Sequence, residues 1–219
     1  MDDPRGTPRR ALVTLCVTEV TSWGVLYYAF PVLAPSISAD TGWSIAAVTA
    51  GFSLGLVVAA VAGVPVGRLL DRYGPRPVMT AGTLLAIPAI LAVAASQTLL
   101  EFLAAWAFAG VAMSAVLYQP AFAALTRWYG PRRVGALTIL TLAAGLASTV
   151  YAPITAALAE YLRWRQTYAV LAVVVALITL PGHFLDCGCR GRPRRRPGRE
   201  TTRPTRSPAA RASSSSPPR

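Results

Sequence analysis

The stretch Gly67-Arg68-Leu69-Leu70-Asp71-Arg72-Tyr73-Gly74-Pro75-Arg76-Pro77 lies between two long apolar runs. It holds three arginines and one acid within eleven residues, a composition that does not suit a soluble core. A short basic turn between apolar runs of about 20 residues is typical of a cytoplasmic loop joining two transmembrane helices. We therefore predict that the chain crosses a membrane on both sides of this turn.

The composition extends this prediction to the whole chain. Of 219 residues, 54% are hydrophobic and only 14% are charged, whereas a soluble domain carries about 25% charged residues. Apolar segments of about 20 residues recur along the chain, and each can cross a hydrocarbon layer of about 30 Å as a helix. The predicted fold is therefore all-α: an integral membrane bundle of six helices, after an N-terminal arm at 1–10. The predicted spans are 11–33, 44–67, 77–96, 100–126, 133–158 and 166–185.

The arginines predict the orientation of this bundle. All 21 basic residues are Arg, and 19 of them fall on one side of the predicted topology. The other two, Arg163 and Arg165, precede the sixth span. Because cytoplasmic segments are rich in basic residues, we predict a multi-pass protein of the plasma (inner) membrane with both termini in the cytoplasm. The net charge of +12 then reflects topology, and we expect no nucleic-acid partner.

Residues 186–219 have a different composition from the spans. From Arg190 onward they consist almost entirely of Arg, Pro, Ser, Ala, Thr and Gly. Such a segment cannot bury a core, so we predict a disordered cytoplasmic tail. Two interpretations stay open. The tail is either a polybasic segment attracted to anionic lipid head groups, at ~1 kcal/mol per Arg, or the product of a GC-rich gene read out of frame.

The order Gly-x-Leu-x-Asp-Arg-x-Gly-x-Arg at Gly67–Arg76 resembles the signature loop of the major facilitator superfamily of transporters. In that family the loop follows the second of twelve helices, so the resemblance implies an N-terminal six-helix half. Other segments look closest to the branch of monocarboxylate and oxalate–formate carriers, and the resemblance covers about 1–185. These segments are Trp23–Pro31, Thr41–Ser44, Arg127–Arg133 and Trp164–Arg165.

The resemblance also implies a role for the signature loop. In the family this loop latches the two six-helix halves together in the outward-facing state. By the resemblance, Gly67, Asp71, Arg72, Gly74 and Arg76 form this conformational latch, and Asp71 caps a helix of the second half. We expect Gly67 to let helices approach closely, and Arg72 and Arg76 to hold Asp71 ionised. With six spans, transport would require a homodimer or a separate second half.

Glu19 is the strongest candidate for a coupling residue. It lies about nine residues into the first span, hence ~13 Å from its start. A carboxylate at that depth costs a few kcal/mol unless it is paired, protonated or hydrated. Trp23, Tyr27 and Phe30 follow on the same helical face. An acid beside an aromatic stripe favours a water-lined cavity in which Glu19 exchanges a proton; the alternative is a packing role with a hydrogen bond to a neighbouring helix.

Tyr118 and Gln119 in the fourth span complete the candidates. In the resembled family, the first and fourth helices of each half line the central cavity. Many proton-coupled members carry an Arg in span four, four residues before a Gly, whereas Trp106 stands at that distance from Gly110. The alternative for the polar residues is helix-to-helix hydrogen bonding. The predicted substrate and coupling residues are Glu19, Trp23, Tyr27, Tyr118 and Gln119.

We find no nucleophile–base pair, metal-ligand cluster or glycine-rich phosphate loop, so we expect no enzymatic activity, cofactor or metal. His183 is expected to be an interfacial residue. The predicted function is transport of a small organic solute, with possible proton coupling, by half of a secondary carrier that works by alternating access. The expected partners are the lipid bilayer, the solute, and a second half or a second copy. The alternative is a truncated or frameshifted six-span protein without transport activity.

Overall fold

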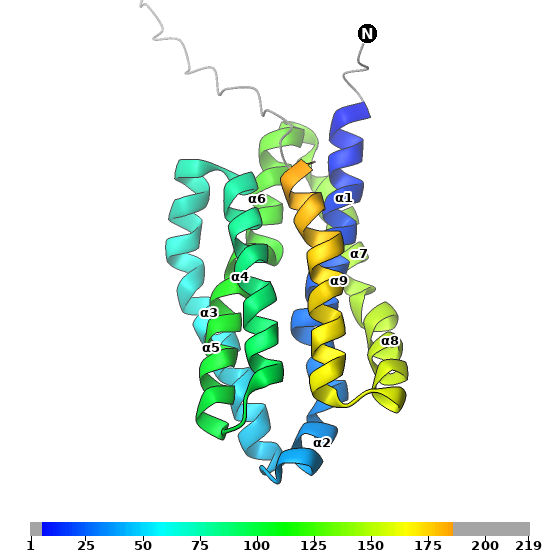
Figure 1. Cartoon of the computed structure of the whole chain (residues 1–219). Coiled ribbons are helices and arrows are strands. Elements are labelled where there is room, and N and C mark those ends of the chain that lie inside the picture. The colour runs from blue at the N-terminus through cyan, green and yellow to red at the C-terminus, as the bar shows by residue number, and fades with distance from the viewer. Residues whose placement is uncertain (1–5, 186–219) are drawn as a thin grey trace, which may run out of the picture.

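The structure, a computed structural model, describes residues 6–185, which are almost entirely helical (Figure 1). Six spans are long and apolar enough to cross a membrane, as the sequence predicts. The predicted tail at 186–219 and the first residues of the arm lie outside the described residues. The elements are α1 (Gly6–Trp23), the π-helical turn η1 (Gly24–Tyr28), α2 (Ala29–Thr41), α3 (Ile45–Tyr73), α4 (Pro75–Ala95), α5 (Leu99–Val116), α6 (Tyr118–Tyr129), the 3-10 turn η2 (Gly130–Arg132), α7 (Arg133–Gly145), α8 (Ala147–Tyr161) and α9 (Trp164–Leu185).

The helices run further than the predicted spans, most clearly at Gly67–Pro77. The expected eleven-residue turn is instead the last part of α3, a single connecting residue, and the start of α4. Arg and Leu are good helix formers, so α3 continues through them to Tyr73. It ends at Gly74, whose φ of 87° favours glycine, and Pro75 is pre-set for the first turn of α4. Likewise, α2 continues to Thr41 before Gly42 turns the chain at φ 73°.

Three of the six spans are interrupted near their middle. The first contains η1, the fourth breaks at Leu117, and the fifth breaks at Leu146. Pro120 explains the break in span four, because it has no N–H to donate to the carbonyl of Val116. At 1.5 Å per residue, the start of η1, Leu117 and Leu146 lie about 18–22 Å from the end of the bundle at which Arg9, Tyr129 and Arg133 lie. They therefore share one depth.

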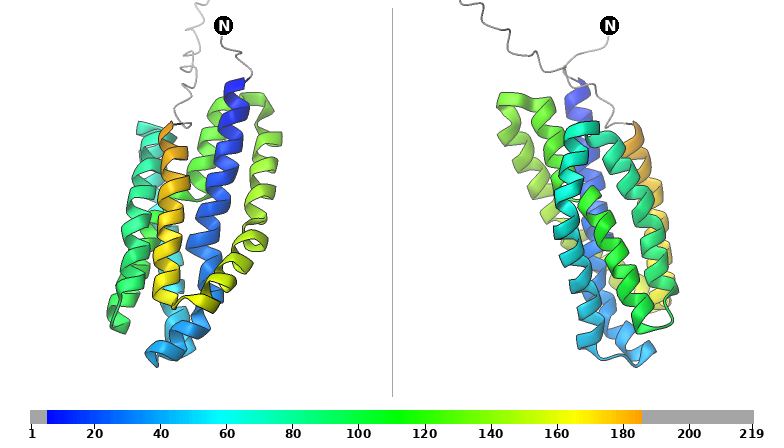
Figure 2. Two further views of the ribbon diagram at one scale, coloured as in Figure 1. Left: turned by 45° about the vertical axis from the view of Figure 1, so that its right-hand side comes forward. Right: turned by 90° about the vertical axis from the view of Figure 1, so that its left-hand side faces the viewer.

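The spans form two groups, one around α5 and one around α1, and the groups meet along the contact between α4 and α9 (Figure 2). α5 packs between α3 and α4, and α1 packs between α9 and α7. Small residues allow the closest approaches: a Cβ on Gly110 would collide with the backbone of Gly55, and one on Gly82 would lie 2.7 Å from the Cβ of Ala115. Lipid tails are as apolar as leucine side chains, so hydrophobic burial does not drive membrane helices together. Close backbone packing at small residues is therefore important for holding them together.

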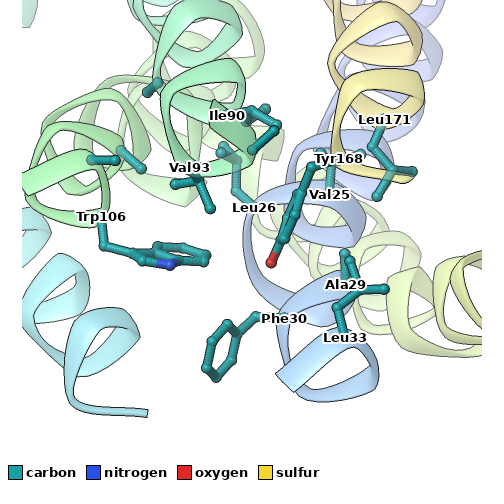
Figure 3. Packing of buried hydrophobic residues seen from close by; sticks show 14 of the residues in the cluster. Val25, Leu26, Ala29, Phe30, Leu33, Ile90, Val93, Trp106, Tyr168 and Leu171 are labelled. Atoms are coloured by element: carbon teal, nitrogen blue, oxygen red, sulfur yellow. The ribbon is translucent and has the colours of Figure 1, made fainter. Parts of the chain in front are cut away.

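The core gathers around Trp106 of α5 (Figure 3). The rings of Phe30 and Phe52 stack with centroids 4.3 Å apart, and the Trp106 indole stands edge-on to them at 5.3 and 5.0 Å. Tyr168 of α9 also stands edge-on to Trp106, with the ring centroids 6.5 Å apart. The position at which proton-coupled members of the resembled family carry an Arg is thus occupied here by the centre of an aromatic core.

Candidate functional site

Glu19 is fully buried in α1 and carries no hydrogen bond on either carboxylate oxygen among the described residues. The hydroxyl of Ser22 and the indole N–H of Trp23 are also buried without a partner. One helical turn therefore holds four buried polar atoms without a close hydrogen bond among the described residues, although the indole N–H of Trp23 interacts with the Glu19 carboxylate one turn away. Buried polar groups in native proteins are nearly always paired, and exceptions commonly mark a bound water, ion or ligand. This turn is the most unusual polar feature of the described chain.

A row of aromatic rings adjoins this turn and joins span one to spans two and four. The Trp23 ring lies 4.8 Å from that of Tyr118 and 5.4 Å from that of Tyr27. Tyr27 continues the row to Phe52 at 5.3 Å, and Tyr118 continues it to Phe122 at 5.2 Å. Trp23, Tyr27 and Tyr118 are each only half-buried, so one side of the row is open.

The interruptions of spans one and four lie at these residues. Trp23 ends α1 where η1 begins, and Tyr118 starts α6 directly after the break at Leu117. Irregular backbone at membrane depth is tolerated where it lies inside protein or lines a cavity. The structure thus brings Glu19, Trp23, Tyr27 and Tyr118 together at the level of the helix breaks.

Gln119 does not join this group. Its side chain is exposed, and its amide lies against α3, where a Cβ on Gly63 would be 3.1 Å from both Nε2 and Oε1. Tyr118 and Gln119 are adjacent in the sequence, but adjacent helical residues point about 100° apart. Gln119 therefore faces α3, while Tyr118 faces Trp23.

The predicted latch residues lie together at the arginine-rich end, but their side chains are arranged differently from our expectation. Arg72 lies over the ring of Tyr73, with Cζ 5.1 Å from the centroid. Arg76 donates from Nη2 to the carbonyl oxygen of Phe184 at 2.6 Å. Neither forms an ion pair with Asp71, whose exposed carboxylate has no cationic partner among the described residues. Gly67 has no described atom within 4 Å of its Cβ position, so it makes no close helix approach inside this bundle.

Arg127 is a contact of the latch that sequence reasoning missed. At the end of α6, its Nη2 donates to the carbonyl oxygens of Leu70 at 3.1 Å and Asp71 at 3.5 Å. Both carbonyls belong to the last turn of α3, where a cation is favourable. The Leu70 carbonyl also accepts from the Gly74 N–H at 2.9 Å, whereas the Asp71 carbonyl has no helical donor because residue 75 is proline. In the sequence, only the presence of two basic turns points to this contact. The 57 positions between Arg127 and Leu70 do not predict that the two residues meet.

A second polar cluster joins spans one, three and six at the opposite end. Trp164 Nε1 donates to Asp40 Oδ2 at 2.8 Å, and Arg165 Nη1 donates to the same oxygen at 2.7 Å. Arg165 Nη2 also donates to the carbonyl oxygen of Ser96 at 2.8 Å. Sequence reasoning singled out Trp164 and Arg165 through the family resemblance and missed their partner Asp40. This cluster closes the end of the bundle that carries few arginines.

His183 is not the interfacial residue that the sequence suggests. It is fully buried in α9, and its Nδ1 lies 2.8 Å from Oγ1 of Thr83 in α4. The Thr83 hydroxyl also donates to the carbonyl oxygen of Met79 at 3.0 Å, so the neutral His183 tautomer with its proton on Nδ1 would complete this hydrogen-bond pair. The bond joins α4 to α9 inside the bundle. No group of three or more metal-ligating side chains occurs among residues 6–185.

Comparisons with known proteins agree with this architecture. The sequence model of the Major Facilitator Superfamily matches residues 15–217. Monocarboxylate transporter 13 of Bos taurus is 32% identical over 174 residues, covering 78% of this chain and 37% of the relative. Monocarboxylate transporter 11 of Homo sapiens is 33% identical over 187 residues, covering 83% of this chain and 36% of the relative.

An archaeal protein is also similar: the uncharacterized 38 kDa protein in the 23S RNA operon of Thermoproteus tenax is 29% identical over 175 residues, covering 80% of this chain and 46% of the relative. The chain thus spans less than half the length of these curated relatives. The family model, the transporter relatives and the six apolar spans together show that this chain is a multi-pass membrane protein that belongs to the Major Facilitator Superfamily of transporters, in its monocarboxylate-transporter-like branch.

Proposed function

We propose that this six-helix unit is one half of a secondary carrier that moves a small organic solute by alternating access. One observation carries the proposal: Glu19 is buried without a cationic partner among the described residues, beside the half-open row of Trp23, Tyr27 and Tyr118 at the depth of the helix breaks. Carriers of this architecture bind solute near the bilayer midplane, where interrupted helices meet. The turn from Glu19 to Trp23 is the proposed solute site.

The chemistry of the site suits a small carboxylate that travels with a proton. A carboxyl group with no cation beside it is cheapest in apolar surroundings when it carries a proton. Protonated Glu19 and the Trp23 indole N–H then offer two donors to a solute carboxylate, and the aromatic rings cover its apolar part. Release of the proton from Glu19 would remove one donor and favour release of the solute. The names of the two mammalian relatives support a monocarboxylate as the solute class.

A second six-helix unit is required in this proposal, from a homodimer or from additional chain. Large parts of α3, α7 and α8 are not buried in the bundle and provide surface for it. The free carboxylate of Asp71 at the end of α3 is suited to cap a helix of that unit. In this proposal, Gly67, Asp71, Arg72, Gly74 and Arg76 are the latch between the two units.

The same proposal gives the orientation. The start of α1, the turns at Gly74 and Gly130, and the end of α9 lie at one end of the bundle (Figure 1). Arg9, Arg72 and Arg127 belong to that end. By the positive-inside rule this end faces the cytoplasm, with the protein in the plasma membrane and both termini inside.

Reconstitution of the full chain tests the proposal. The purified protein in proteoliposomes is expected to take up radiolabelled lactate or pyruvate when an inward proton gradient is imposed, and to be a dimer by light scattering in detergent. Empty liposomes and a gradient collapsed by an uncoupler are the controls. A monomeric protein without uptake of either solute would contradict transport by this chain and would favour the inactive six-span protein.

A further inference from the structure

An apolar groove runs between α3 and α4 near the arginine-rich end. Both helices pack more closely on α5 than on each other, although a single residue, Gly74, connects them. Gly82 brings α4 against Ala115 of α5, and these small residues form the floor. Leu69 and Tyr73 line one wall and Ala81 and Leu85 the other. The groove encloses about 300 Å³ and is almost entirely apolar.

The groove opens outward from the bundle, and its volume of about 300 Å³ is small. Leu69, Tyr73 and Leu85 are 44, 56 and 38% exposed, so their side chains face the surroundings. A helix with its side chains is about 10–12 Å across, whereas a lipid acyl chain is a single row of methylenes. Because these helices cross the membrane, an acyl chain is the occupant that the shape of the groove favours.

Positive charge lies at the mouth of the groove. The guanidinium of Arg72 rests over Tyr73, the wall residue next to the end of α3, with Cζ 5.1 Å from the ring centroid. Arg72 makes no hydrogen bond or ion pair among the described residues, unlike Arg76, which is bound to the carbonyl of Phe184. The acid nearby, Asp71, is two positions before Tyr73 and so points to the other side of α3.

We propose that this groove binds one acyl chain of an anionic phospholipid and that Arg72 binds its phosphate. The apolar walls hold the chain, and the guanidinium supplies the charged hydrogen-bond donors that a phosphate prefers. Basic pockets between membrane helices on the cytoplasmic side are a known way of binding anionic head groups. The site shares Arg72 with the proposed latch, but it uses none of the residues of the Glu19 turn, so it does not depend on the solute that is transported.

The test is native mass spectrometry of the full, delipidated chain titrated with dioleoyl phosphatidylglycerol or dioleoyl phosphatidylcholine. The wild-type protein is expected to retain the first phosphatidylglycerol in preference to phosphatidylcholine. Arg72→Gln is expected to reduce that preference about fivefold, the effect of one arginine near a lipid surface. Arg133→Gln, another exposed arginine at the same end, is the matched control and should leave the preference unchanged.

A second pair of variants tests the groove itself. Ala81→Phe fills the groove and should abolish retention of the first lipid of either kind. Ala92→Phe adds the same ring to an exposed position of α4, eleven residues away and on nearly the same face, and should have no effect. Thermal unfolding of each variant confirms that it folds.

Three results would overturn the proposal. The first is equal retention of the two lipids by the wild-type protein. The second is an unchanged lipid preference in Arg72→Gln, and this result can be interpreted even if Ala81→Phe does not fold. The third is a dimer that excludes the first lipid, because it would show that a second copy covers the groove. Preference for phosphatidylglycerol that Arg72→Gln removes would support the proposal even if the chain transports nothing.

Discussion

Arg127, at the end of the fourth span, donates to the carbonyl oxygen of Leu70 at 3.1 Å and so fixes the end of the second span. The two residues are 57 positions apart. Each belongs to one of the two arginine-rich turns, which the sequence presents as separate features. The contact joins the two turns into one unit. Asp71 lies at the edge of this unit, and its carboxylate has no cationic partner in the described part of the chain.

Removal of the Arg127 guanidinium should therefore loosen the end of α3. We expect Arg127→Gln to lower the free energy of unfolding by about 1 kcal/mol, because a charged donor to two carbonyls is lost at a partly exposed site. The measurement is unfolding in detergent, followed by circular dichroism. Arg133→Gln removes a charge at the start of the neighbouring α7 and serves as the control. Equal stability of the two variants would contradict the capping role.

Glu19→Gln tests the proposed coupling. Glutamine keeps the size of the side chain but cannot exchange a proton, so uptake driven by a proton gradient should fall at least tenfold while expression and stability stay near the wild-type values. Glu160→Gln, at an exposed position near the end of α8, is the matched control and should keep full uptake. Full proton-driven uptake by the Glu19→Gln protein would remove Glu19 from the mechanism and leave it a packing role.

The Asp40–Arg165 pair is suited to a double-mutant cycle. Its side chains are 29% (Arg165) and 43% (Asp40) exposed, so solvent screens the interaction. We expect a coupling free energy of about 0.5–1 kcal/mol between Asp40→Asn and Arg165→Gln, measured from unfolding of the single and double variants. Additive effects would show that the 2.7 Å contact contributes no stability. The Trp164 N–H also donates to Asp40, and the effect of Asp40→Asn on that hydrogen bond cancels in the cycle because it is common to both Asp40→Asn proteins.

Two glycines should respond in opposite directions to the same substitution. In Gly110→Ala the new methyl group meets the backbone of Gly55, so α3 and α5 must separate, and we expect a loss of more than about 2 kcal/mol or failure to fold. In Gly135→Ala the methyl group meets no described atom, and alanine is the better helix former by up to ~1 kcal/mol. The measurement is the midpoint of thermal unfolding in detergent. A tolerated Gly110→Ala would contradict the close approach of α3 and α5.

Much of the fold is predictable from local sequence. Each span is a continuous apolar segment, so the number of spans follows from composition over about 20 residues at a time. The boundaries are less predictable, because the residues of Gly67–Pro77 are compatible with both turn and helix. Only the backbone shows that the turn is Gly74 alone, with its φ of 87°.

The candidate site is predictable from local sequence only in part. Glu19, Trp23 and Tyr27 share one helix, so their relation follows from helical spacing. Tyr118 was within reach only through the family resemblance, and Gln119, its neighbour, turns toward Gly63 of α3 instead. Which of two adjacent side chains enters the site depends on the rotation of α6 after the break at Leu117, and helical spacing carries no information about that rotation.

The six spans and the gathering of arginines at one end follow from the sequence alone. The reason is that membrane insertion depends on the hydrophobicity of each segment and on the charge of the loops beside it. Contacts between spans were decided by tertiary structure. Trp164 reaches Asp40 across 124 positions, His183 reaches Thr83 across 100, and Glu19 has no cationic partner among residues 6–185. Pairing of buried polar groups depends on how the helices are rotated and stacked, and that packing is a property of the whole bundle rather than of any one span.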